Sequence, residues 1–370
     1  MEMQMLADKS DFIGLEGVTH LATGGEPPLL KTHRDAFEDF ARDKADGQNG
    51  YRRHWQVAEE VRAQLGQLVG MTPEDIALTG SASEGISRVI SSIDWRAGDS
   101  VVTPAAEFAS GRYGLARLEK LGVQVRMVPS KNGLIEIDDL VDVCDSSTRL
   151  LLVSQVSYLT GQQIDVARLS KAMSDRQTAL MIDASHALGV VPVDARHSDF
   201  VVSCGYKWLL STHTGILIWN RARRPGFEPL GVGWNSATEG ELPGSYHLLE
   251  TAERAEVGNP NHLDVYLMRR SLDYLSGIGI DRIAANARAL GGDLRRELVA
   301  LGTEVLTPES EAARAGSIAF AHADCERIMQ TLASEKILVW GDDGRIRLSV
   351  HAFVDQNDIA RFLERVRPIL

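Results

Sequence analysis

The chain has 370 residues and a mass of 40.5 kDa, and 44% of its residues are hydrophobic. Acidic residues outnumber basic ones by 51 to 39, and the formal charge of −12 argues against a nucleic-acid-binding protein, because phosphate binding needs a basic face. No apolar run approaches the roughly 18 residues of a membrane helix, and residues 1–12 lack the pattern of a signal peptide. We therefore expect a cytoplasmic protein with no membrane or nucleic-acid partner.

Metal and disulfide chemistry find no support in the sequence. The three cysteines, Cys144, Cys204 and Cys325, form no C-x-x-C pair, so neither a disulfide framework nor a cysteine-based zinc site is expected. The ten histidines lack ligand spacing, and the H-E-x-x-H, G-K-[ST] and G-x-G-x-x-G motifs are absent. We expect no metal.

The first forty-odd residues mix polar stretches with Pro-Pro and Gly-Gly pairs and indicate an irregular arm. Apolar residues at spacings of three and four then predict a helix over 55–69. A strand over 75–80 ends in a turn, and a helix over 81–93 follows with Ser and Glu near its start.

Strands and helices alternate over the next part of the chain. We expect strands over 100–104, 123–129, 149–157, 179–185, 199–205 and 215–220, and helices over 111–121, 135–144 and 166–173. This alternation is typical of βαβ units and predicts an α/β fold with a mostly parallel sheet flanked by helices.

The pattern changes after about residue 258. Residues 263–302 predict one or two long amphipathic helices, and the order strand, strand, helix, strand, strand, helix follows to residue 370. We therefore expect an N-terminal arm over 1–20, a large domain over 21–262 and a small α+β domain over 263–370.

The residues that follow the expected strands are the first candidates for a site, because parallel sheets bind ligands at the carboxyl ends of their strands. The small residues of Gly80–Gly85 open a helix whose free N–H groups suit a phosphate. Phe108, Tyr158, Asp183 and Lys207 each lie at or just after the end of a further strand.

Asp183 and Lys207 together suggest pyridoxal phosphate (PLP). The cofactor aldehyde needs a lysine amine for a Schiff base, and its pyridine nitrogen needs a carboxylate that keeps it protonated. The phosphate needs a helix N-terminus, and the ring needs a flat or apolar neighbour. Lys207, Asp183, the Gly80–Gly85 turn and Phe108 meet these four requirements.

Several segments resemble the class V aminotransferase family of fold-type I PLP enzymes, which includes kynureninases, isopenicillin N epimerases and cysteine desulfurases. They occur in the family's order: ALTGSASEGI, VSQVSYLTGQ, MIDASHALGVVPVD, DFVVSCGYKW, GNPN, LDYLSGIGIDRIAANARAL and RIRLSV. The resemblance covers nearly the whole chain and implies the corresponding fold, with a large PLP-binding domain and a small C-terminal domain.

The resemblance also implies roles for individual residues. Lys207 matches the Schiff-base lysine, Asp183 the partner of the pyridine nitrogen, and Arg347 the arginine whose fork binds the substrate carboxylate. The other matching positions are Ala82 and Ser83 in the phosphate-binding turn, Phe108 in place of the usual stacking histidine, Tyr158 facing the substrate, His186 near the cofactor's phenolic oxygen, Tyr206 near the phosphate, and Asn259, which reaches the phosphate from the partner subunit. The position of Asn259 implies a homodimer with shared active sites.

Some of these residues also have ordinary structural explanations. Phe108 and Tyr158 could simply pack, Ser83 could cap a helix, and Arg347 could pair with the acidic residues at 342 and 343. The sequence leaves these alternatives open.

The departures from the family pattern narrow the function. The stretch KILVWGDDGRIRLSV contains no cysteine where cysteine desulfurases carry their nucleophile, so we do not expect a desulfurase of the usual type. We expect a PLP-dependent enzyme that acts on an amino acid by transamination or lyase chemistry. An epimerase and a kynureninase-like hydrolase are the alternatives, and a dinucleotide-dependent oxidoreductase or a non-catalytic scaffold is a more distant one.

Overall fold

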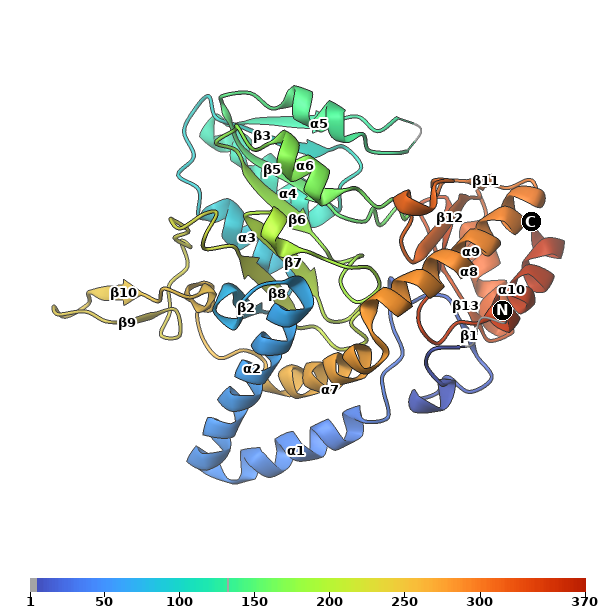
Figure 1. The fold of residues 1–370 in the computed structure, drawn as a ribbon, viewed down its shortest axis with the longest axis horizontal. Helices are drawn as coiled ribbons and strands as arrows, with labels where there is room; N and C mark the ends of the chain where they lie inside the picture. Colours follow the sequence, from blue (N-terminus) through green and yellow to red (C-terminus); the bar gives the residue numbers. More distant parts are fainter. Residues whose placement is uncertain (1–4, 132) are drawn as a thin grey trace.

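A seven-stranded sheet forms the centre of the computed structural model, which describes residues 5–131 and 133–370 (Figure 1). The strand order is β2-β8-β7-β6-β5-β3-β4; β8 runs antiparallel to both of its neighbours, and the remaining pairs are parallel. The strands are β2 (Ile76–Thr79), β3 (Ser100–Pro104), β4 (Gln124–Val128), β5 (Thr148–Ser154), β6 (Ala179–Asp183), β7 (Phe200–Cys204) and β8 (Gly215–Trp219). The predicted α/β fold with a mostly parallel sheet is confirmed.

Helices cover both faces of this sheet. Leu150 and Leu152 of β5 pack toward one face with residues of α3 and α4, whereas Leu151 and Val153 pack toward the other with residues of α2, α5, α6 and α7. The covering helices of these two faces are α2 (Gly47–Val69), α3 (Ala82–Ser91), α4 (Ala109–Ala116), α5 (Ile137–Val143), α6 (Val166–Ala172) and α7 (His262–Ile278). Burial on both faces explains the nearly continuous apolar runs of the central strands.

The expected irregular arm is wrong for residues 33–45, which form helix α1 (His33–Ala45), and α2 begins at Gly47 instead of residue 55. Both helices pack against α7, at the bottom of Figure 1. Few apolar side chains of α1 are buried, and its contacts are partly polar: Asp43 accepts hydrogen bonds from the Tyr266 hydroxyl at 2.6 Å and from Arg53 Nε at 2.7 Å. Apolar spacing therefore gives little sign of this helix.

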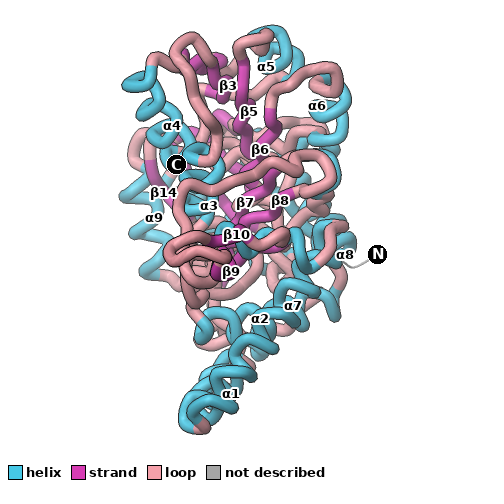
Figure 2. Tube along the Cα trace, turned by 90° about the vertical axis from the view of Figure 1, so that its left-hand side faces the viewer, coloured by secondary structure: helices cyan, strands magenta, loops and turns pink. Residues whose placement is uncertain are grey.

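The C-terminal part contains a four-stranded antiparallel sheet in the order β11-β12-β15-β14. Its elements are α8 (Ile280–Ala300), β11 (Glu304–Val305), β12 (Ser317–Ala321), α9 (Cys325–Ser334), β13 (Ile337–Leu338), β14 (Trp340–Asp342), β15 (Arg345–Ser349) and α10 (Gln356–Val366). A separate hairpin of β9 (Ala237–Glu239) and β10 (Tyr246–Leu248) projects at the left of Figure 1, on the side away from the C-terminal part, and faces the viewer in Figure 2. No helix in the described ranges has the length and apolarity needed to cross a membrane.

The N-terminal segment packs on this C-terminal part. Strand β1 (Thr19–His20) pairs in parallel with β13, and the backbone N–H groups of Leu6 and Ala7 donate to the Ala352 carbonyl, each at 3.1 Å. Lys9 forms an ion pair of 2.5 Å with the buried Asp358 of α10. The first and last segments of the chain are therefore held together.

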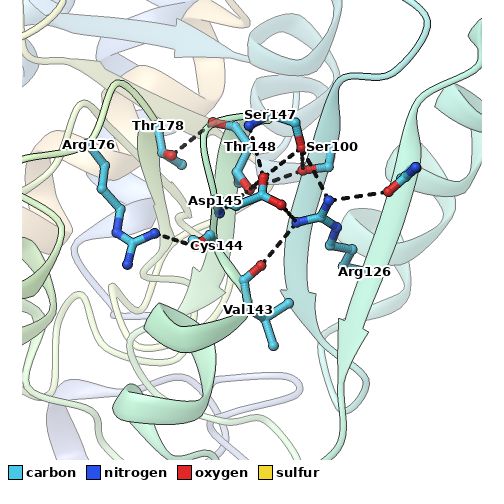
Figure 3. A network of polar contacts seen from close by, with 10 residues as sticks. Ser100, Arg126, Val143, Cys144, Asp145, Ser147, Thr148, Arg176 and Thr178 are labelled. Atoms are coloured by element: carbon cyan, nitrogen blue, oxygen red, sulfur yellow. Dashed lines mark hydrogen bonds and ion pairs between the residues drawn. The ribbon is translucent and has the colours of Figure 1, made fainter.

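A polar network fixes the amino end of β5 (Figure 3). Asp145 accepts hydrogen bonds from Ser147 Oγ at 2.6 Å and Ser147 N at 2.9 Å, and it pairs with Arg126 of β4 at 2.7 Å. The Ser147 hydroxyl and Arg126 hold the pKa of Asp145 well below its usual range. Thr148 and Ser100 share a hydroxyl hydrogen bond of 3.0 Å, so the network ties together β3, β4 and β5.

A buried ion pair ties α2 to the edge of the sheet. Arg62 and Glu256 are both about 1% exposed, and Arg62 Nη2 lies 2.8 and 3.0 Å from the two carboxylate oxygens. Glu256 also accepts hydrogen bonds from the backbone of Leu78 in β2 at 2.7 Å and from Asn235 at 3.1 Å. Burial raises the pKa of Glu256 to about 7, although Arg62 opposes the shift.

Replacing Arg62 is therefore expected to destabilise the protein strongly. Arg62→Met leaves the Glu256 carboxylate buried without its cation, which lowers the free energy of unfolding by about 3–5 kcal/mol. Urea unfolding at pH 7 measures this loss. Arg168→Met is the matched control, because its ion pair with Asp138 is exposed and contributes less than about 1 kcal/mol. Equal losses in both variants would contradict the claim that the buried Arg62–Glu256 pair matters more for stability than an exposed pair.

Candidate active site

Three parallel strands bring their carboxyl ends to one edge of the large sheet. Ser154, the last residue of β5, pairs directly with Asp183, the last residue of β6, and β7 ends beside them at Cys204. The chain leaves β7 in a turn that carries Tyr206 and Lys207. This edge is the one at which the sequence predicted a site.

A narrow pocket lies at this edge. Most of the predicted site residues line it: Ala82, Ser83, Phe108, Tyr158, Asp183, His186, Tyr206 and Lys207. The lining also includes Ser81, from the predicted Gly80–Gly85 turn, and Cys204. The sequence did not single out the further lining residues Ile86, Ser110, Ser154 and Ser185. Several of these directly adjoin a predicted residue or end a strand, and that position is the signal that could have identified them.

Lys207 is the buried cation of the pocket. Its Nζ lies 3.2 Å from His186 Nε2, 5.5 Å from the centre of the Phe108 ring and 5.6 Å from that of Tyr206. Burial, together with the Lys207 charge, lowers the pKa of His186 well below its usual value. A neutral imidazole therefore faces the lysine amine.

Gly189 holds the Asp183–His186 segment close to Lys207. Its φ is +105°, and a Cβ at this position would lie 2.3 Å from the carbonyl oxygen of Trp208. Only glycine fits such a contact in this backbone conformation without displacement. The segment that follows β6 can therefore pack directly on the chain that follows Lys207.

Two buried carboxyl groups belong to this region: Asp183 lines the pocket, and Glu107 lies behind the lining residues Phe108 and Ser154. Asp183 accepts a hydrogen bond from Ser185 N at 2.8 Å. Glu107 accepts from Ser154 N at 2.6 Å, from Ser154 Oγ at 2.5 Å and from Phe108 N at 2.7 Å, so it joins β5 to the residue at the mouth of the pocket. Burial and the neighbouring Asp183 raise the pKa of Glu107 to about 7.

The helix N-terminus of α3 supplies hydroxyl groups to the other end of the pocket. Ser81, not Ser83, caps the helix, because Ser81 Oγ accepts a hydrogen bond from Glu84 N at 3.1 Å. Ser83 Oγ instead lies 2.7 Å from Ser110 Oγ of α4. The Ser83 side chain is therefore not used as a cap and faces the pocket.

Arg347 and Asn259 lie outside the pocket lining. Arg347 is 4% exposed and donates from Nη1 to the Tyr158 carbonyl at 2.8 Å; burial, followed by the nearby Arg345, lowers its pKa to about 10. The exposed Asn259 accepts a hydrogen bond from the Tyr51 hydroxyl at 3.0 Å. The structure thus brings Arg347 next to the pocket through Tyr158, and it does not bring Asn259 to the pocket of the same chain.

Glu107 should make stability depend on pH in a defined direction. Its pKa in the folded protein, about 7, lies above the ordinary value of 4.5, so folding favours the protonated form. Its contribution to stability is complete below pH 4.5 and is lost as the pH rises through 7.

Glu107→Gln removes this titration, so the stability of the variant relative to wild type is expected to rise between pH 5 and 8. Urea unfolding at several pH values measures the difference. A difference that stays constant across this range would contradict the raised pKa.

Comparisons with known proteins agree with this geometry. A family model described as "Aminotransferase class-V" matches residues 33–362. The probable cysteine desulfurase of Methanothermobacter thermautotrophicus is 27% identical over 274 residues, which cover 72% of this chain and 68% of that protein. The kynureninase of Bacillus anthracis is 26% identical over 341 residues, which cover 86% and 78%.

Solved structures show the same fold. The apo cysteine desulfurase of Thermococcus onnurineus superimposes with a TM-score of 0.90 over 100% of this chain and 99% of that chain, at 21% identity. A variant of C-DES with glycine covalently linked to its PLP cofactor superimposes with a TM-score of 0.89 over 98% and 99%, also at 21% identity.

Proposed function

Because the chain belongs to the class V aminotransferase family, we propose that it is a PLP-dependent enzyme acting on an amino acid, with Lys207 as the residue that binds the cofactor. One observation carries this proposal. The same pocket is lined by the buried Lys207, the buried Asp183 and the N-terminus of α3, and β6 and β7, which precede the aspartate and the lysine, are adjacent parallel strands. The family's use of PLP and the cofactor of the C-DES structure support it.

The polar groups of the pocket fit this cofactor. Ser185 Oγ and His186 Nδ1 are buried and have no hydrogen-bond partner among the described residues, and such groups are normally satisfied in the working state of a protein. Ser83 Oγ and the N-terminus of α3 would bind the phosphate, Asp183 the pyridine nitrogen, and Phe108 the ring face. His186 would lie near the phenolic oxygen, and Ala82 and Tyr206 near the phosphate.

The cofactor, when bound, supplies an electron sink for the bonds at the substrate's α-carbon. Lys207 Nζ would then take and return the α-proton, since Lys207 is the lysine among the residues that line the pocket. Asp183 would keep a proton on the pyridine nitrogen. The neutral His186 lies next to Lys207, within hydrogen-bond distance of its amine.

Arg347 is the proposed partner of the substrate carboxylate, with Tyr158 between it and the pocket. Transamination and lyase chemistry are the first candidates for the outcome, and the alternatives are reprotonation at the α-carbon and hydrolysis of the kynureninase type. These outcomes share every residue named above. They differ in the step that follows removal of the α-proton: delivery of a proton to one or another carbon, loss of a group from the β-carbon, or attack by water.

Cysteine persulfide chemistry of the usual desulfurase type is not part of the proposal, although relatives bear that name. All three cysteines are buried, and burial raises the pKa of both Cys144 and Cys204 to about 11. A thiol that is both buried and protonated is a poor nucleophile. No cysteine occurs in the loop before β15.

A homodimer with shared active sites completes the proposal. Apolar side chains are exposed near Asn259, and Trp234 is 61% exposed while in edge-to-face contact with Trp55 of α2. Leu230 and Val257 are 79% and 42% exposed. Burying this surface against a second copy would allow Asn259 to reach the partner's pocket.

The first test is the absorption spectrum of the purified protein with added PLP. We expect a band near the visible edge that borohydride abolishes and that Lys207→Ala lacks, because Lys207 is the lysine among the described residues that line the pocket. Lys171→Ala, which removes an exposed lysine, is the control and should retain the band. A wild-type protein that stays colourless with PLP would overturn the proposed function.

The dimer is tested by sedimentation. The wild-type protein should sediment at twice its chain mass of 40.5 kDa, and Trp234→Asp should shift it toward the monomer by placing a charge in the interface. Val299→Asp alters a similarly exposed apolar residue on α8 and should leave the dimer intact. A monomeric wild type would refute shared active sites.

A further inference from the structure

Two buried arginines lie side by side on strand β15. Arg345 and Arg347 are two residues apart, so they share one face of the strand, with Cα atoms roughly 6.5–7 Å apart. Ser349 is on the same face, and its hydroxyl accepts a hydrogen bond at 3.0 Å from Gly24 N in the N-terminal segment. Ile346 and Leu348 belong to the opposite face, in the apolar core.

Arg345 has little of the pairing that a buried guanidinium needs. It is 6% exposed, yet its ion pair is a single contact of 3.4 Å with Asp343, whose own side chain is 67% exposed. Asp342 lies across from it on β14 but forms no ion pair with it among the described residues. Arg345 Nε and Arg347 Nε are both buried without a partner in the described part of the chain. A buried guanidinium without a buried counter-charge costs free energy unless a bound anion supplies the missing contacts.

Tyr158 connects Arg345 to the pocket. The Arg345 guanidinium lies over the Tyr158 ring, 5.4 Å from its centre, and the same ring contacts Phe108 edge to face at 5.2 Å. Arg347 holds the Tyr158 backbone from the same strand. Burial is the main cause of the lowered pKa of His186, and the nearby Lys207, Arg347 and Arg345 each lower it further. Three cations therefore converge on one site in a chain whose formal charge is −12.

We propose that Arg345 binds a second anionic group, on the side chain of an amino acid whose α-carboxylate is bound by Arg347. The substrate class is then an acidic amino acid of the aspartate, glutamate or sulfinate type. This inference rests on the proposed function for the identity of the first carboxylate. One buried arginine is enough for a neutral amino acid, whereas two guanidinium groups on one strand face, neither paired with a buried carboxylate among the described residues, match a dianion. Each is suited to a bidentate contact.

Binding of unreactive acids to the PLP-loaded enzyme tests the proposal. Isothermal titration calorimetry with succinate, glutarate and butyrate compares two dianions of different length with a monoanion. We expect succinate or glutarate to bind at least about tenfold more tightly than butyrate, from the charge-assisted contact with Arg345. Arg345→Met should abolish this preference while leaving butyrate affinity within about twofold.

Two further variants separate a binding role from a structural one. Arg345→Lys retains the charge but not the fork, so it should keep part of the preference if Arg345 contacts the anion. Arg96→Met removes an exposed arginine from a distant loop and should keep all of it. Thermal unfolding of each variant checks that it is folded.

A wild-type enzyme that binds butyrate as tightly as both diacids would overturn the inference, and this comparison needs no variant. A preference that survives in a folded Arg345→Met protein would also overturn it. These failures differ from failure of the proposed function, which is read from the Lys207-dependent absorption band. A yellow enzyme without diacid preference refutes the role of Arg345 alone.

Discussion

Burial of the central strands on both faces is the constraint on which the site depends. A charged side chain in the middle of β5, β6 or β7 would lose its water without gaining a partner. Charged groups are therefore confined to the strand ends, and parallel pairing brings those ends to one edge. Asp183 and the turn carrying Lys207 are adjacent for this reason. The polar networks elsewhere, such as the one around Asp145, secure the opposite ends of the same strands.

The chain satisfies the charges at this edge only in part. Burial and the neighbouring Asp183 raise the pKa of Glu107, although the three hydrogen bonds that it accepts oppose the shift, so Glu107 is more readily protonated than an ordinary carboxyl group. Lys207 has a neutral histidine as its neighbour. Arg347 has a backbone carbonyl instead of a carboxylate. The groups that remain free to bind a ligand are mostly cations. The pocket and its surroundings therefore favour a ligand that carries anionic groups.

Much of this arrangement could be predicted from the sequence, because strand ends are visible as the points where apolar runs stop. That reasoning singled out Asp183 and Lys207, and these line one pocket together with most of the other residues that it singled out. It missed α1, whose packing depends on polar contacts such as those of Asp43, and these leave little apolar period. It also missed the link from Glu107 to Ser154, because hydrogen bonds between distant strands have no sequence signal. The burial of Arg345 could not be predicted either, because it depends on the position of the Tyr158 ring, which the sequence does not reveal.

Arg347 differs from the other candidate residues because it comes from the small sheet. The loop after β5 is nevertheless bound to that sheet at two points: Arg347 holds the Tyr158 carbonyl, and Gly161, with φ +72°, approaches Ser317 so closely that a Cβ would lie 2.1 Å from its carbonyl oxygen. These contacts exist within the protein itself and do not require a ligand. An arginine that is already fixed loses little side-chain freedom when a carboxylate binds, so more of the contact energy is available for affinity. The close packing between the two parts of the chain thus prepares the site for its substrate.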